Sequence, residues 1–106
     1  MPDPDDTGEM MTRDEILATL RRFKQECGEK YGILELGLFG STARGEAGEE
    51  SDVDICIKTT TPNPFILVHI KEEIESLIGR RIDLIRVRDA MNHFLKTRLE
   101  RETLYV

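Results

Sequence analysis

Hydrophobic positions in the first third of the chain recur at helical spacing. From Thr12 to about Lys30, apolar residues return every three or four positions, which predicts an amphipathic helix. Thr12 and Glu15 have the capping-box spacing that starts such a helix, and Gly32 breaks the pattern. The buried face of this helix is expected to consist of Ile16, Leu17, Leu20, Phe23 and Cys27.

The pattern then changes to that of strands. The apolar run Ile33–Phe39 predicts a first strand and Ser51–Lys58 predicts a second, with residues 42–51 between them as a turn and a polar loop. One face of the first strand is expected to carry Leu34, Leu36 and Leu38. In the second strand, the side chains free to enter a core are Val53, Ile55 and Ile57.

The last part of the chain alternates again between the two spacings. A helix is predicted from about Asn63 to Ile78, where Gly79 ends it, and a third strand is predicted over Arg81–Val87. Asp89 is expected to cap a last helix. The apolar faces are Leu67, Ile70, Ile74 and Leu77 in the first of these helices, and Met91, Leu95 and Leu99 in the last.

This order of elements predicts an α/β protein. We expect a small mixed sheet of three to four strands, with about four helices packed on it. Residues 1–11 are rich in proline and acidic side chains and are expected to form a disordered acidic tail. Residues 12–106 are expected to form a single domain, because 106 residues are enough for one core but not for a second folded lobe.

Charge narrows the classes of function. Hydrophobic residues make up 39% and charged residues 34%, as in ordinary globular chains. The net charge of −6 argues against a general nucleic-acid binder, so no direct nucleic-acid binding is expected. The segment 80–102 nevertheless carries seven basic residues against four acidic ones. A basic segment beside carboxylates suits a metal-bridged nucleotide, although a solvated helix face explains most of these side chains equally well.

Cysteine usage and hydropathy indicate a compartment. Cys27 and Cys56 lie far apart with no Cys-x-x-Cys spacing, which predicts reduced thiols and a cytoplasmic location. The acidic N-terminus has no apolar segment of the kind found in signal peptides. No apolar run approaches the length needed to cross a bilayer, so no membrane association is expected.

Two carboxylates at the start of the second strand are the first chemical signal. Asp52 and Asp54 are two positions apart, so on a strand their side chains point to the same face with Cα atoms roughly 6.5–7 Å apart. Converging carboxylates repel each other unless a cation lies between them. Oxygen ligands favour a hard cation such as Mg²⁺, which usually shares its shell with substrate phosphates.

The end of the first strand is the second signal. Gly40 allows a sharp turn and a close approach of the backbone to a ligand. Ser41 is a candidate N-cap for a short helical turn whose N–H groups could hold a phosphate, and Arg44 lies near enough in sequence to assist. Phosphates held at Gly40 and Ser41, with a metal held at Asp52 and Asp54, describe a phosphoryl-transfer site.

A third carboxylate interrupts the apolar third strand. Asp83 lies between Ile82 and Leu84, where an unpaired charge is costly. It could pair with Arg80, Arg81 or Arg86, or it could bind the metal, and the second interpretation is preferred. Likewise, Ser41 could be only a helix cap and Arg44 only a surface residue.

The order of these motifs resembles that of the minimal nucleotidyltransferases of the polymerase-beta-like superfamily. Their signature is a hydrophobic strand, Gly-Ser, a spacer that often reads x-Ala-Arg-Gly, then Ser-Asp-x-Asp and a second hydrophobic strand. In this chain Gly40–Gly45 reads GSTARG, Ser51–Ile55 reads SDVDI, and Ile82–Leu84 matches the later strand that carries the third carboxylate. The resemblance extends from about Thr12 to the C-terminus.

The resemblance implies a nucleotidyltransferase that uses two Mg²⁺ ions. Asp52 and Asp54 would hold the ions that bridge the triphosphate of ATP or another NTP. Asp83 would bind one metal and draw the proton from the attacking hydroxyl. Gly40 and Ser41 would hold the β- and γ-phosphates while a nucleoside monophosphate is transferred and pyrophosphate leaves.

The acceptor is implied by the resemblance alone. Small proteins of this kind are typically antitoxins that neutralise a HEPN-domain toxin by adenylylating a tyrosine. One alternative is an antitoxin or nucleotide-binding module that neutralises its partner by binding without turnover. A less favoured alternative is a small-molecule nucleotidyltransferase of the aminoglycoside-modifying kind. The oligomeric state, homo- or hetero-oligomer, stays open.

Overall fold

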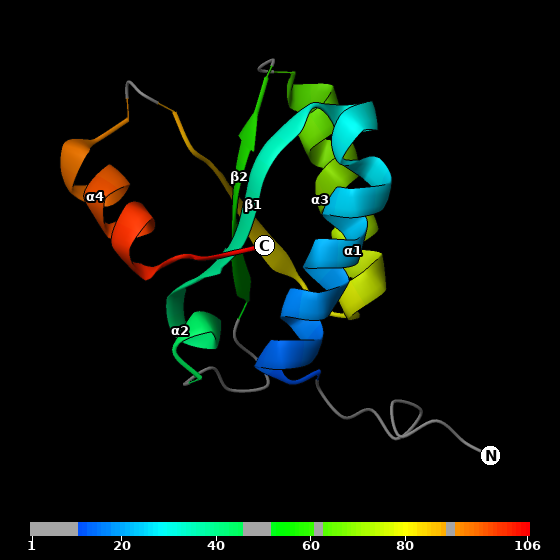
Figure 1. Cartoon of the computed structure of the whole chain (residues 1–106), viewed down its shortest axis with the longest axis horizontal. Helices are drawn as coiled ribbons and strands as arrows, with labels where there is room; N and C mark the ends of the chain where they lie inside the picture. The colour runs from blue at the N-terminus through cyan, green and yellow to red at the C-terminus, as the bar shows by residue number, and fades with distance from the viewer. Residues whose placement is uncertain (1–10, 46–51, 61–62, 89–90) are drawn as a thin grey trace.

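Four helices and four strands alternate along residues 11–45, 52–60, 63–88 and 91–106, the part of the chain that the computed structural model describes (Figure 1). They are α1 (Arg13–Tyr31), β1 (Ile33–Phe39), α2 (Gly40–Ala43), β2 (Val53–Thr59), α3 (Pro64–Ile78), β3 (Ile82–Arg86), α4 (His93–Glu102) and β4 (Leu104–Tyr105). The expected acidic tail lies outside the described residues, except for Met11.

The four strands form one mixed sheet in the order β3-β2-β1-β4. Strand β1 runs antiparallel to β2 and β4, whereas β2 and β3 are parallel. Helices α1 and α3 cover one face of the sheet and α4 lies on the other side (Figure 1). The predicted α/β fold with a small mixed sheet is therefore confirmed.

Local signals account for the ends of α1 and α3. Thr12 Oγ1 accepts a hydrogen bond from Glu15 N at 3.2 Å, and Thr12 N donates to Glu15 Oε1 at 2.9 Å, which completes the predicted capping box. Asn63 caps α3 in a similar way through its side-chain oxygen. Gly32 and Gly79 end the two helices in the left-handed conformation, where glycine avoids the Cβ strain of other residues.

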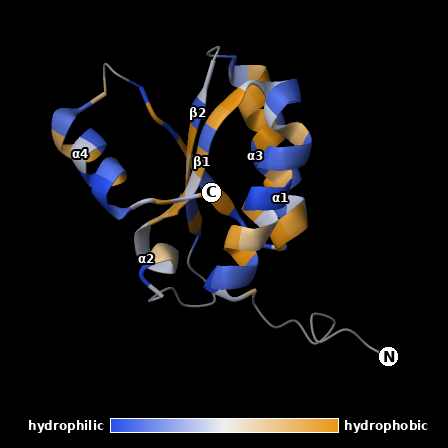
Figure 2. Cartoon of the chain, in the orientation of Figure 1, coloured by the Kyte–Doolittle hydropathy of each residue, from blue (hydrophilic) through white to orange (hydrophobic). Residues whose placement is uncertain are grey.

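The sheet separates two hydrophobic clusters. The larger one lies under α1 and α3, and its members in β2 are Val53, Ile55 and Ile57, as predicted. The smaller one lies on the α4 face and consists of Phe39, Cys56 and Leu99. Hydrophobic colouring is concentrated on the strands and α3, while α4 is mostly hydrophilic (Figure 2). Within the described residues, no helix combines the length and apolarity needed to span a membrane.

Two predicted faces need correction. Leu34 was expected on the same face of β1 as Leu36, but Leu36 is buried and Leu34 is 49% exposed. The pairing of β1 with β2 shifts register between Ile33 and Glu35, and such a bulge turns the extra residue out of the alternation. In α3 the last buried position is Ile78 rather than Leu77, which is exposed.

The C-terminal part also differs from the prediction. Helix α4 begins at His93, and Asn92 Oδ1 accepts from the N–H groups at 94 and 95, so the prediction of Asp89 as the cap is wrong. Asp89 itself lies outside the described residues. Strand β4 was not predicted, because two residues are too few to show an alternating pattern.

Candidate active site

Strand pairing brings the distant carboxylate to the other two. In the parallel ladder between β2 and β3, Asp54 is the register partner of Asp83. Register partners on neighbouring strands are about 4.8 Å apart and share a face. Asp52 precedes β2 by one residue, at the same end of the sheet. Alternation places all three on the α4 side, opposite the face that α1 and α3 cover.

Electrostatics at Asp54 reflect this crowding. Partial burial raises the pKa of the Asp54 carboxyl above its usual range, and the neighbouring charges of Asp83 and Asp52 raise it further. The charge of Arg44 acts in the opposite direction and lowers it. Two carboxylates and one arginine therefore act on the charge of Asp54.

The carboxylates do not form a closed cluster. Within the described residues, no three aspartate, glutamate, histidine or cysteine side chains gather at the spacing of a metal site. Asp52 and Asp83 are exposed and Asp54 is half-buried. The donor set nevertheless fits a hard divalent cation, because carboxylate oxygens on neighbouring strands are the ligands that Mg²⁺ takes. The assignment of all three as metal ligands stays a prediction.

Gly40 lies directly against this group. Its φ of +77° is in the left-handed region, and its neighbour Phe39 is the register partner of Asp54. A Cβ at position 40 would overlap Asp54 Oδ2 and come within 3.2 Å of Asp54 Cγ. Only glycine therefore allows the β1–α2 turn to approach the carboxylate so closely. This contact joins the predicted phosphate turn to the predicted metal ligand.

The helical turn α2 starts two residues earlier than predicted. Its N-cap position is Phe39, which makes no side-chain cap, so the prediction of Ser41 as the N-cap is wrong. Ser41 instead lies inside the turn and is half-buried. Arg44 closes the turn by donating from its backbone N to Gly40 O at 3.2 Å, and Gly45 follows with a positive φ. The position of Arg44 near Asp54 agrees with a role at the site.

Asp83 has no arginine partner in the described part of the chain. No ion pair within 4.0 Å joins it to Arg80, Arg81 or Arg86 there. Its close neighbour is the like-charged Asp54 across the strand pair. The simple structural explanation of Asp83, a salt bridge, is thus not supported.

Two further residues at the α2 turn, one of them in α1, were not predicted from the sequence. Arg13 Nη1, at the start of α1, donates to Ala43 O at 3.3 Å and so ties α2 to the first helix. Thr42 is 6% exposed, and its hydroxyl has no hydrogen-bond partner among the described residues. The sequence pattern around Arg13 does not indicate its contact with Ala43, which lies thirty positions further along the chain.

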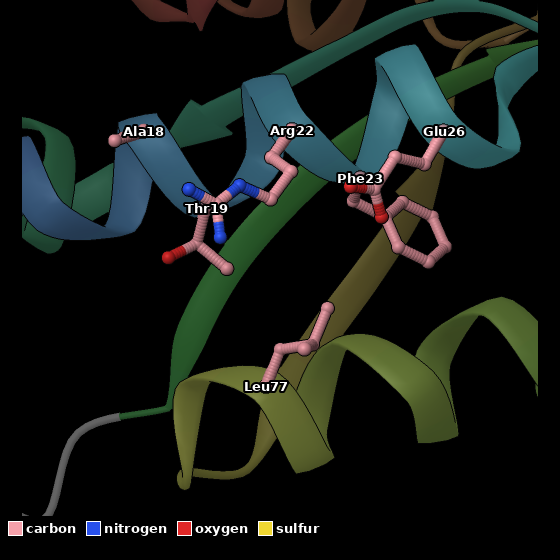
Figure 3. Close-up of a pocket in the computed structure, with 6 residues that line it drawn as sticks. All are labelled: Ala18, Thr19, Arg22, Phe23, Glu26 and Leu77. Atoms are coloured by element: carbon pink, nitrogen blue, oxygen red, sulfur yellow. The ribbon is translucent and has the colours of Figure 1, made fainter.

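A surface pocket lies away from the carboxylates. It has a volume of about 310 Å³ and lies between α1 and α3, on the other side of the sheet (Figure 3). Its lining residues are Ala18, Thr19, Arg22, Phe23, Glu26 and Leu77. Its acidic group is a single carboxylate, so the chemistry is better assigned to the β2–β3 site.

Comparison with known proteins identifies the family of the chain. The nucleotidyltransferase domain family matches residues 20–106. The chain is 40% identical over 98 residues to protein adenylyltransferase MntA of Thermococcus cleftensis, a match that covers 92% of this chain and 98% of that protein.

Solved structures share the fold. One, provisionally described as a minimal nucleotidyltransferase, has a TM-score of 0.75 and 26% identity and covers 89% of this chain and 95% of that one. Another, the tri-AMPylated HEPN toxin of Shewanella oneidensis with its MNT antitoxin, has a TM-score of 0.55 and covers 88% of this chain and 66% of that one. At 17% identity, the second shows the fold alone. With this match over most of its length, the chain belongs to the nucleotidyltransferase family and, within it, to the minimal nucleotidyltransferases.

Proposed function

We propose that this protein is a magnesium-dependent adenylyltransferase that transfers AMP from ATP to a tyrosine hydroxyl of a HEPN-domain toxin and thereby acts as its antitoxin. The observation that carries the proposal is the register pair of Asp54 and Asp83 directly beside Gly40. The name of the relative in Thermococcus cleftensis supports the reaction, and the Shewanella oneidensis complex supports the class of partner.

Each side chain has a distinct task in this reaction. Asp52, Asp54 and Asp83 would hold the divalent ions that the family generally uses, which we propose to be two Mg²⁺. When bound, such ions neutralise charge on the triphosphate and on the attacking and leaving oxygens. Gly40 and Ser41 offer backbone N–H groups to the β- and γ-phosphates.

The acceptor hydroxyl must lose a proton as it attacks. Asp83 lies on the edge strand β3, beside Asp54, and is exposed, so an incoming hydroxyl can reach it. We assign it the role of proton acceptor. The positive charge of Arg44 lowers the pKa of Asp54. The same charge would stabilise an anionic nucleotide bound next to Asp54.

A second candidate is an antitoxin that binds nucleotide or toxin without turnover. The observation in its favour is that the three carboxylates do not meet at metal-ligand spacing in the described residues. A catalyst would have to close this group around its ions, whereas a binding module would not. In both cases we expect a cytoplasmic protein that assembles with its partner and does not bind nucleic acid directly.

Intact-mass spectrometry separates the two. The chain is co-expressed with its cognate HEPN-domain protein, and wild type is compared with Asp83→Asn. The enzyme predicts a partner heavier by one or more adenylyl groups with wild type and an unmodified partner with Asp83→Asn, although the two proteins still bind. A partner that stays unmodified yet inhibited with wild type would establish the binding module instead.

A further inference from the structure

A groove runs between α3 and the edge strand β3. Its volume is about 150 Å³, roughly that of five water molecules in the liquid, so it has room for one aliphatic side chain. The lining consists of three apolar and two basic residues, which are Leu67, Val68, Leu84, Lys71 and Arg86. The apolar surface continues along α3, where Val68 is 55% exposed and Phe65 is 85% exposed.

One of the two basic lining residues has an unmet hydrogen-bond donor. Arg86 Nε is buried and has no acceptor among the described residues, which is an unfavourable state for a charged group. Lys71 lies on the same groove. These two basic residues line one groove of a chain whose overall net charge is −6. A carboxylate is the group that would satisfy Arg86 and match this local charge.

The outer edge of β3 offers backbone groups beside the groove. Val53 N donates to Arg81 O at 3.1 Å, and Val87 N donates to Ile57 O at 2.8 Å. Alternation along the strand then points the N–H groups of Ile82, Leu84 and Arg86 away from β2. Ile82 N is held by Glu75 Oε2 at 2.9 Å, and β3 is the last strand on its side of the sheet.

We propose that this groove and the outer edge of β3 form the docking site for an extended acidic segment of the protein to be modified. The segment lies beside β3 as an added strand, with an aliphatic side chain in the groove and carboxylates next to Lys71 and Arg86. Because β3 also carries Asp83, docking there brings the acceptor protein to the strand that holds the proposed proton acceptor. This inference rests on the proposed function, because it names the surface that selects the substrate.

A protein segment fits better than a nucleic acid. The groove needs an apolar occupant, which a phosphate backbone does not provide.

The first test uses amide NMR shifts of the wild-type protein. Two synthetic peptides of equal length serve as probes, one alternating valine with glutamate and the other alternating valine with lysine. We expect the glutamate peptide to shift the amide resonances of Leu84 and Arg86 and those of α3 around Lys71. Single-stranded RNA is the third probe. Shifts of these resonances that are caused by the RNA or by the lysine peptide, and not by the glutamate peptide, would overturn the proposal.

The second test uses charge reversal. Lys71→Glu/Arg86→Glu should weaken binding of the cognate HEPN-domain protein about tenfold, since two favourable contacts become repulsive. The matched control is Arg21→Glu/Arg101→Glu, which changes the net charge by the same amount at two exposed positions outside the groove. Stabilisation by Mg²⁺ and ATP should be equal in both variants and wild type, which shows an intact nucleotide site.

The outcomes distinguish docking from catalysis. Wild-type affinity and wild-type modification of the partner with Lys71→Glu/Arg86→Glu overturn the docking site and leave the adenylyltransferase in place. A partner that loses affinity for this variant, but never gains mass with wild type, supports the docking site and overturns the enzyme. Equal losses in the groove variant and the control pair would show an effect of net charge and overturn the docking site.

Discussion

Replacing Gly40 by alanine tests the geometry on which the site depends. At a φ of +77° a non-glycine residue costs roughly 1–2 kcal/mol. The new Cβ would also overlap Asp54 Oδ2 and lie 3.2 Å from Asp54 Cγ. The carboxylate can relieve the overlap by rotating, so we expect the steric part near the lower end of overpacking costs, about 1 kcal/mol. That rotation moves the carboxylate away from its place beside Gly40.

A second glycine provides the matched control. Gly79 has a φ of +76°, and a Cβ there would meet nothing within 4 Å. Gly79→Ala therefore carries the backbone strain without the overlap, and its Tm should fall by about 4–16 °C, since 1 kcal/mol shifts the Tm of a domain near this size by roughly 4–8 °C. The Tm of Gly40→Ala should fall about 4–8 °C further than that of Gly79→Ala. Gly45→Ala, with a φ of +74° and equally open space, controls for position in the turn.

The assay is thermal unfolding with and without Mg²⁺ and ATP. We expect Gly79→Ala and Gly45→Ala to keep the ligand-induced rise in Tm and Gly40→Ala to lose most of it. In an Asp54→Ala background the extra cost of Gly40→Ala should disappear, because its steric partner is gone. A Gly40→Ala protein with the Tm of Gly79→Ala and a full ligand response would refute the proposed contact between the turn and the carboxylate.

Four other predictions follow from the same geometry. Asp54→Asn should be more stable than wild type in the absence of divalent ions. Because the pKa of Asp54 is raised, its contribution to stability is present at acid pH and is lost as pH rises through that pKa. The difference in Tm between Asp54→Asn and wild type should therefore grow with rising pH in a series of thermal melts. Asp52→Asn/Asp54→Asn should lose the rise in Tm that Mg²⁺ and ATP cause in wild type, and equal shifts would contradict the metal assignment. Asp83→Asn should end adenylyl transfer, as mass spectrometry would detect, while pull-down of the partner persists. Glu75→Ala removes the acceptor of Ile82 N and should lower the free energy of unfolding by about 1–3 kcal/mol in urea titrations, whereas no change would show that water replaces the bond.

Local chemistry in the sequence was enough to define most elements. The capping box of Thr12 and Glu15, and the glycines that end α1 and α3, act through neighbours a few residues away, so their effect can be read without a fold. The alternation of Val53, Ile55 and Ile57 likewise follows from strand geometry. The carboxylate pair of β2 and the Gly-Ser turn could be recognised for the same reason.

Tertiary structure decided how these parts meet. That Asp83 is the register partner of Asp54, and pairs with no arginine within the described residues, depends on the register of two strands that lie far apart in the sequence. Three other features depend on such pairings in the same way. They are the overlap that a Cβ at Gly40 would cause, the bulge at Leu34 and the two-residue strand β4. Sequence periodicity shows which face of an element is apolar. The register between two strands and the choice of the edge strand are instead set by packing between segments that long loops connect. No local pattern carries that information.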